Sequence, residues 1–195
     1  MSFELVVIGT SYGGLSALQI LLPGLTGDFP LPVVVVQHRG KEAGHGLCDF
    51  LRKCSPLPLG EPNDKEAIAP GRVYLAPRDY HLLVEKGGFA LSTEAPVGFA
   101  RPSINVLFES AADVYQEHIV GVILTGANHD GARGLARIKS YGGVAIVEDP
   151  ASAESTAMPS AAIAATDVDA VLPIAAIAPY LNEICRPPSR LSYAG

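Results

Sequence analysis

Mainly apolar runs of strand length alternate with helical patterns along most of this chain. Residues 31–37 and 119–125 are almost continuously apolar and rich in β-branched side chains, as expected of parallel strands covered on both faces. Residues 4–8 and 144–147 show the same pattern. This alternation predicts a doubly wound α/β fold, with a mostly parallel sheet and helices on both of its faces.

The expected elements can be given by residue range. Strands are expected at 4–8, 31–37, 57–59, 72–77, 81–85, 89–91, 119–125, 144–147 and 170–172, and helices at 12–22, 44–53, 104–115, 132–140, 159–165 and 174–185. The turn Arg78-Asp79 and the pair Gly87-Gly88 predict a small antiparallel β-hairpin insertion that includes 72–77. Ser103 is the expected N-cap of the helix at 104–115.

Length and charge limit the classes of protein. The 195 residues fit one domain, expected over 1–185, with a frayed tail at 186–195. A net charge of −6 without a basic cluster argues against nucleic acid as a partner. No apolar run reaches membrane-spanning length and no signal peptide is evident, so we expect a cytoplasmic protein that is not inserted in a membrane. Cys48, Cys54 and Cys185 are expected to be free thiols.

Three chemically complementary residues follow three of the expected parallel strands. Ser11 follows the first strand, His38 follows the strand at 31–37, and Asp130 lies just beyond the strand at 119–125. Ligands of a doubly wound sheet bind outside the carboxyl ends of its strands, so these side chains should share one edge. A hydroxyl, an imidazole and a carboxylate are what nucleophilic catalysis by serine requires.

Each residue also has a structural interpretation that involves no chemistry. Ser11 is consistent with an ordinary turn former or helix cap, and His38 with a polar residue at a strand end. Asp130, which precedes Gly131 and a helix, is consistent with an N-cap. The arrival of all three types at one edge favours the catalytic interpretation.

A nucleotide site is the weakest alternative for the first turn. The spacing Gly9-x-x-x-Gly13-Gly14 lacks the middle glycine of a dinucleotide fingerprint, and Gln37-His38 ends the second strand where that site wants a carboxylate. The same segment, Gly9-Thr-Ser-Tyr-Gly13, matches the G-x-S-x-G pattern of a nucleophilic serine.

Several separated blocks of this sequence resemble the CheB chemotaxis protein-glutamate methylesterase family, in its catalytic domain. The blocks are Ile8-Gly-Thr-Ser-Tyr-Gly-Gly14, Val36-Gln-His38, Pro70-Gly-Arg-Val-Tyr-Leu-Ala-Pro77 with His81, Arg101-Pro-Ser103, Leu124-Thr-Gly126 with Asp130-Gly131-Ala132, and Met158-Pro159. The resemblance implies a serine hydrolase of glutamyl methyl esters, in many members also a glutamine deamidase. It implies Ser11 as nucleophile, His38 as general base and Asp130 as the orienting carboxylate. The implied partner is the cytoplasmic region of methyl-accepting chemoreceptors, and no cofactor or metal is implied.

The oxyanion site and the cleft are expected from the resemblance together with the turn at 126–128. Gly126, Ala127 and Asn128 are the expected region of backbone oxyanion donors, and Tyr12, Arg101 and Met158 are expected to shape the cleft. The chain departs from the family at Tyr12, where threonine is usual, and at Ala127, where methionine is usual. His129 is expected to face solvent.

A phospho-receiver domain usually precedes the esterase in the family. This chain begins almost at the first strand, so we expect an esterase without that domain, and regulation by a separate protein is then an open alternative. Two alternatives to the methylesterase remain: a degenerate site that only binds a partner, and an esterase acting on a different ester.

Overall fold

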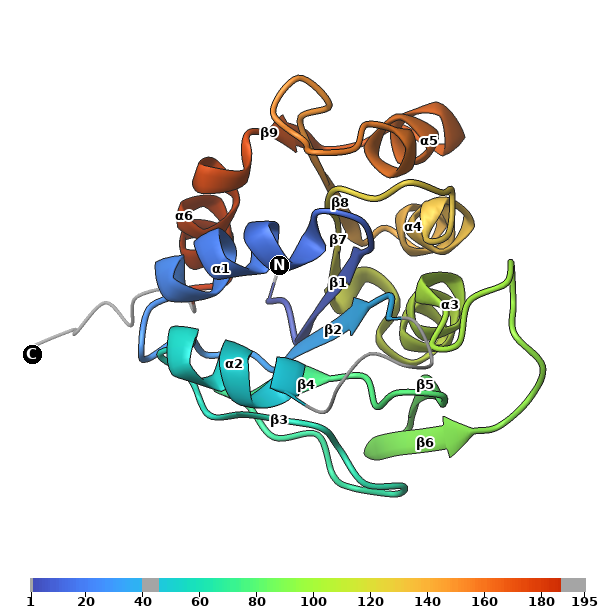
Figure 1. Cartoon of the computed structure of the whole chain (residues 1–195). Helices are drawn as coiled ribbons and strands as arrows, with labels where there is room; N and C mark the ends of the chain where they lie inside the picture. Colours follow the sequence, from blue (N-terminus) through green and yellow to red (C-terminus); the bar gives the residue numbers. More distant parts are fainter. Residues whose placement is uncertain (1, 40–45, 187–195) are drawn as a thin grey trace, which may run out of the picture.

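The computed structural model describes residues 2–39 and 46–186, and it confirms the predicted doubly wound fold (Figure 1). Its main sheet has the order β3-β4-β2-β1-β7-β8-β9, and every neighbouring pair is parallel. The strands are β1 (Leu5–Thr10), β2 (Val33–Gln37), β3 (Leu59–Gly60), β4 (Val73–Leu75), β7 (Ile119–Ile123), β8 (Val144–Glu148) and β9 (Ala170–Leu172).

Helices cover both faces of this sheet and enclose two hydrophobic cores (Figure 1). One face carries α1 (Gly14–Gly24), α2 (Gly46–Cys54) and α6 (Ile174–Ile184); the other carries α3 (Ile104–Tyr115), α4 (Ala132–Ser140) and α5 (Ala157–Ala165). Side chains of β1 alternate between the cores: Val6 and Ile8 enter the first, and Leu5 and Val7 the second. A strand buried on both sides therefore reads as the continuous apolar run seen in the sequence.

The predicted hairpin insertion exists, but one of its predicted members belongs elsewhere. Strands β5 (His81–Glu85) and β6 (Gly88–Ser92) pair antiparallel in a separate two-stranded sheet. The prediction that 72–77 joins them was wrong, because β4 lies parallel to β2 in the main sheet with Val73 opposite Val33. Val73 and Leu75 enter one core while Tyr74 enters the other, which suits a strand covered on both faces.

Two local boundaries differ from the predictions for reasons that bear on the site. Helix α1 begins at Gly14, not at residue 12, because Gly13 adopts a left-handed conformation (φ 79°) and the preceding residues form a turn. Ser103 does occupy the N-cap position of α3, yet its side chain makes no capping hydrogen bond. The start of the helix predicted at 44–53 and the tail predicted at 186–195, apart from Arg186, lie outside the described residues.

The order of the strands opens a crevice beside β1. Strands β2 and β7 flank β1 on opposite sides, so the chain connections diverge at its carboxyl end. Ser11, His38 and the segment that leads to Asp130 all emerge there.

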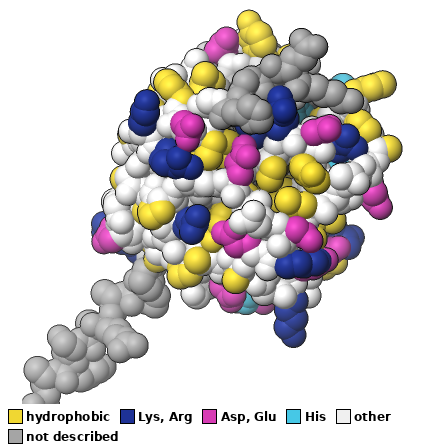
Figure 2. All heavy atoms as spheres, turned by 60° about the horizontal axis from the view of Figure 1, so that its bottom comes forward, with side chains coloured by type: hydrophobic (Ala, Val, Ile, Leu, Met, Phe, Trp, Pro, Cys, Tyr) yellow, Lys and Arg dark blue, Asp and Glu magenta, His cyan; other side chains and the backbone are white. Residues whose placement is uncertain are grey.

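On the face in Figure 2, basic side chains are interspersed with acidic ones and do not gather into a basic patch. Within the residues that the structure covers, no helix combines the length and the hydropathy needed to cross a membrane.

Candidate active site

Ser11 lies in the tight turn between β1 and α1. Its N–H donates to the carbonyl of Thr125 (3.0 Å), and its own carbonyl accepts from the N–H of Gly14 (3.0 Å). Gly14 must lack a side chain, because a Cβ there would lie 2.0 Å from Oε1 of Gln37 and 2.4 Å from Oγ1 of Thr10. The glycines therefore let the turn pack closely against its neighbours with the serine at the mouth of the crevice.

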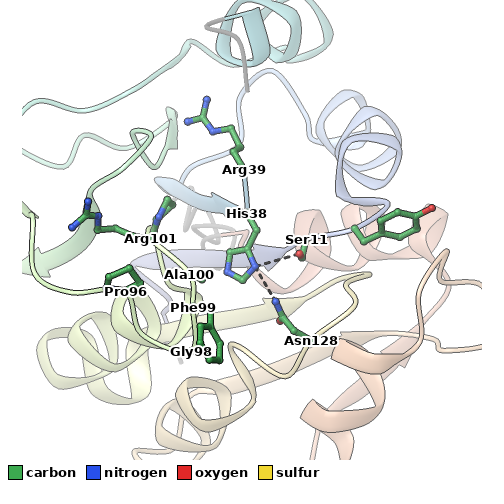
Figure 3. A pocket seen from close by; sticks show the side chains of 11 residues that line it. Ser11, His38, Arg39, Pro96, Gly98, Phe99, Ala100, Arg101 and Asn128 are labelled. Atoms are coloured by element: carbon green, nitrogen blue, oxygen red, sulfur yellow. Dashed lines mark hydrogen bonds between the residues drawn. The ribbon is translucent and has the colours of Figure 1, made fainter. Parts of the chain in front are cut away.

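His38 lies between Ser11 and Asp130, and Figure 3 shows its ring facing Ser11. Its Nδ1 lies 3.2 Å from Oγ of Ser11, and its Nε2 lies 2.8 Å from Oδ2 of Asp130. An ionised carboxylate can only accept, so we assign the proton of the neutral ring to Nε2. The lone pair of Nδ1 then faces the serine hydroxyl.

Asp130 is buried and accepts hydrogen bonds from four groups. Besides His38, Oδ2 accepts the N–H of Ile104 (2.7 Å), while Oδ1 accepts the hydroxyl of Ser103 (2.9 Å) and the N–H of Asn105 (3.0 Å). Burial opposes ionisation, but the hydrogen bonds from His38, Asn105 and Ile104 outweigh it and leave the pKa of this carboxyl below its ordinary value. Asp130 thus orients His38 and also caps the N-terminus of α3, the task predicted for Ser103.

Gln37 ties the nucleophile segment to the base segment. Its Nε2 donates to the carbonyl of Ser11 (2.8 Å) and to the carbonyl of His38 (2.9 Å). One buried amide therefore fixes the relative position of the two backbone segments that carry the hydroxyl and the imidazole.

Thr125 and Glu148 support the turn from the side of β7 and β8. Oγ1 of Thr125 donates to the carbonyl of Tyr12 (2.9 Å), and its N–H donates to Oε2 of Glu148 (2.8 Å). Glu148 is buried; this burial, together with the charge of Asp149, raises the pKa of its carboxyl despite the hydrogen bond from Thr125.

A cleft of about 500 Å³ opens over Ser11 and His38 (Figure 3). Its lining includes Tyr12, Asn128 and the segment 98–102. Arg101 lies in this lining as predicted, but its guanidinium donates to the carboxylate of Asp79 and to the carbonyls of Thr93 and Glu94. Its observed contacts therefore hold the cleft wall in place.

The residues predicted for the oxyanion site and the cleft differ in their burial and in their hydrogen bonds. The N–H of Gly126 donates to the carbonyl of Ser155 (3.3 Å), so this donor is already engaged, whereas Ala127 is exposed. Met158 is fully buried behind Gly126, and its N–H donates to the carbonyl of Gly126 (2.9 Å). His129 is exposed, as expected.

Asn128 reaches the base with its side chain, a contact that the sequence analysis missed. Its Nδ2 lies 3.2 Å from Nδ1 of His38, and its Oδ1 accepts the N–H of Asp130 (3.0 Å). The hydrogen bonds of Gln37 and Ser103 within the site were not predicted from the sequence either. The position of Gln37 directly before His38 was the one available signal.

Among residues 2–39 and 46–186, no group of three or more His, Cys, Asp or Glu side chains is placed to hold a metal ion. The side chains that meet at the mouth of the crevice are a hydroxyl, an imidazole and a buried carboxylate.

Comparison with known proteins shows the family to which the chain belongs. The family model described as CheB methylesterase matches residues 6–181. A protein of Leptospira interrogans, provisionally named protein-glutamate methylesterase/protein-glutamine glutaminase, is 48% identical over 91% of this chain and 93% of its own length. A protein-glutamate methylesterase/protein-glutamine glutaminase of Anaeromyxobacter dehalogenans is 42% identical over 94% of this chain, which spans 54% of that relative. The crystal structure of the Thermotoga maritima CheB methylesterase catalytic domain superposes with a TM-score of 0.89 at 36% identity, covering 94% of this chain and 100% of that one.

Proposed function

Because this chain belongs to the CheB methylesterase family, we propose that it hydrolyses glutamyl methyl esters on the cytoplasmic region of chemoreceptors, with Ser11, His38 and Asp130 as its catalytic residues. The observation that carries the proposal is the continuous contact from Oγ of Ser11 through the ring of His38 to Oδ2 of Asp130. Family membership supplies the class of substrate, and this geometry supplies the chemistry.

The first half of the reaction is acyl transfer to the serine. Oγ of Ser11 attacks the ester carbonyl while Nδ1 of His38 accepts its proton, and the carboxylate of Asp130 stabilises the imidazolium through Nε2–H. The tetrahedral intermediate then collapses, and methanol leaves with the proton from Nδ1. The glutamyl group remains esterified to Ser11.

Water completes the cycle through the same groups. Nδ1 of His38 takes a proton from the water that attacks the acyl-enzyme, and the serine leaves with that proton. We assign the oxyanion to backbone N–H groups of Tyr12, Ala127 and Asn128, since the N–H of Gly126 is engaged with Ser155. One such donor is typically worth about 3 kcal/mol in the transition state.

The same machinery accounts for a second reaction, the deamidation of glutamine. The relatives' names include a protein-glutamine glutaminase activity. An amide requires protonation of a poorer leaving group, and the imidazolium of His38 supplies that proton to the amide nitrogen, which leaves as ammonia. We therefore propose glutamine side chains of the same protein substrate as slower substrates.

The decisive experiment compares Ser11→Ala with Ser16→Ala, an exposed serine on α1. Methanol release from a methylated chemoreceptor fragment, hydrolysis of a small activated ester and fluorophosphonate labelling are measured for each. Ser11→Ala should lose all three with unchanged thermal unfolding, and Ser16→Ala should keep them. Hydrolysis of the small ester without methanol release from the receptor would retain the esterase but reject this substrate. Complete inertness of the parent protein would instead favour a site that only binds a partner.

A further inference from the structure

One residue on the wall of the cleft has a conformation that its side chain does not favour. Residues 97–100 form a tight turn in which Val97 donates to Ala100 (3.1 Å) and Ala100 donates back to Val97 (3.0 Å). Both central residues have positive φ, 57° at Gly98 and 67° at Phe99. Glycine or asparagine is preferred at such a position, because a bulky side chain there is strained.

The ring of Phe99 is also fully exposed, with an accessible fraction of 104%. Among the described residues, three other non-glycine positions have positive φ, and all three are polar: Lys65, Asp79 and Gln116. Phe99 therefore combines backbone strain with an apolar ring that buries no surface in the folded chain. Neither property stabilises the fold, and strain of this kind is found preferentially where a ligand is bound.

The backbone that leads to Phe99 is held in place by hydrogen bonds from two neighbouring side chains. Arg101 holds the preceding segment through the carbonyls of Thr93 and Glu94, and Nε2 of His81 contacts the carbonyl of Ala95 (3.1 Å). These bonds tie the backbone before the turn to Arg101, which follows it, and to His81. A backbone that is already ordered loses less conformational freedom when a ligand binds.

Phe99 lines the same cleft as Ser11 and His38 (Figure 3), and so does Tyr12, whose ring is 62% exposed. A group that binds Phe99 or Tyr12 therefore lies in the cleft that also contains the nucleophile. Phe99 and Tyr12 are the aromatic side chains of this lining, so they are suited to an apolar part of the substrate.

We propose that Phe99, together with Tyr12, is a specificity determinant that binds apolar side chains beside the glutamyl ester of a polypeptide substrate. This inference rests on the proposed function and adds to it a preference of the enzyme for glutamyl esters flanked by apolar side chains. The enzyme should distinguish an ester flanked by leucine from the same ester flanked by serine, because only leucine buries apolar surface against the rings.

The test uses two synthetic peptides that each carry one glutamyl methyl ester, flanked by leucine in one and by serine in the other. Phe99→Gly is the informative variant, because glycine accepts the observed φ and the substitution should not unfold the chain. Gln116→Gly is the matched control, since it replaces another residue of positive φ (49°), on η1 (Gln116–His118) and outside the cleft. The kcat and KM of each peptide are measured, and binding is measured separately in a Ser11→Ala background.

The parent protein and Gln116→Gly should prefer the leucine peptide about tenfold in kcat/KM. Phe99→Gly should lose most of this preference through KM, and its Ser11→Ala form should bind the leucine peptide correspondingly less tightly. An unchanged preference in Phe99→Gly, or no preference in the parent, overturns the inference. If the peptides bind with the expected preference but are not hydrolysed, the proposed function fails, and what stands is the preference of the cleft for apolar side chains. If neither peptide binds the parent, the inference is rejected, and the small-ester assay then reports separately on the chemistry.

Discussion

The Nδ2 atom of Asn128 lies 3.2 Å from Nδ1 of His38, the same distance that separates this nitrogen from Oγ of Ser11. A neutral ring that donates through Nε2 to Asp130 has one lone pair at Nδ1. Two donors, an amide and a hydroxyl, therefore compete for one acceptor. Once Nδ1 receives the serine proton, it becomes a donor and the contact with the amide turns unfavourable.

We predict that Asn128→Ala raises the acylation rate about two- to tenfold, the range expected when one competing hydrogen bond is removed. The backbone N–H at position 128 remains, so an oxyanion donor there is retained. Stopped-flow measurement of the acylation of Ser11 by an activated ester checks this. A tenfold decrease would show that the side-chain amide serves the oxyanion instead.

Asp130→Asn should lower kcat about 10³- to 10⁴-fold and also destabilise the fold, because the carboxylate both orients His38 and caps α3. Loss of hydrogen bonds to a charged group predicts a decrease of about 2–4 kcal/mol in the free energy of unfolding at neutral pH.

The pH dependence of that destabilisation follows from the lowered pKa of Asp130. The stabilisation by the ionised carboxylate is complete at a pH above the ordinary aspartate pKa of about 4. It is lost as the pH falls through the lower pKa that Asp130 has in the folded protein. Urea unfolding of both proteins should therefore show a difference that is large at neutral pH and shrinks as the pH falls below the ordinary carboxyl pKa. A difference independent of pH would contradict this role of the charge.

Gln37→Leu should reduce kcat more than it raises KM. It removes the hydrogen bonds that Gln37 makes to the carbonyls of Ser11 and His38, so the two segments lose their common anchor. One lost buried hydrogen bond costs about 1–3 kcal/mol, which corresponds to roughly 5- to 150-fold in rate. Steady-state kinetics on a small ester measure it, with the exposed Gln19→Leu as control. Equal losses in both variants would assign the effect to general destabilisation.

Glu148→Gln should stabilise the protein at neutral pH. Since the pKa of Glu148 is raised in the folded state, stability is lost as pH rises from about 4 through that raised value. Glutamine stays neutral and retains an oxygen that accepts the N–H of Thr125. The Tm of Glu148→Gln should therefore exceed that of the parent by a few degrees at a pH above the raised pKa, and should equal it in acid. Glu154→Gln, at an exposed position, should leave the Tm unchanged. A lower Tm in Glu148→Gln at neutral pH would disprove the argument.

The parts of the site that follow from strand order could be predicted from the sequence. Ser11, His38 and Asp130 each stand just beyond a recognisable buried strand, and a parallel sheet brings such ends together whatever the details of packing. The contacts from Ser11 to His38 and from His38 to Asp130 have the distances that this reasoning requires.

The parts that depend on long-range partners could not be predicted. Ser103 has the position of a helix cap, but a carboxylate 27 residues further along the chain performs that task. The strand at 73–75 is short and is followed by a turn, so the sequence suggested that it pairs with the next strand, 81–85. The structure instead places it beside β2 in the main sheet, where it is buried on both faces. The contact of Asn128 with His38 depends on a rotamer within a turn, which residue type does not specify.

The double task of Asp130 has an evolutionary consequence. A lineage that abandons hydrolysis can discard the hydroxyl or the imidazole at little cost to its fold, but not the carboxylate that holds the first turn of α3. Inactive descendants of this protein should therefore keep an acidic residue at position 130 long after positions 11 and 38 have drifted, so an aspartate there is poor evidence of surviving activity.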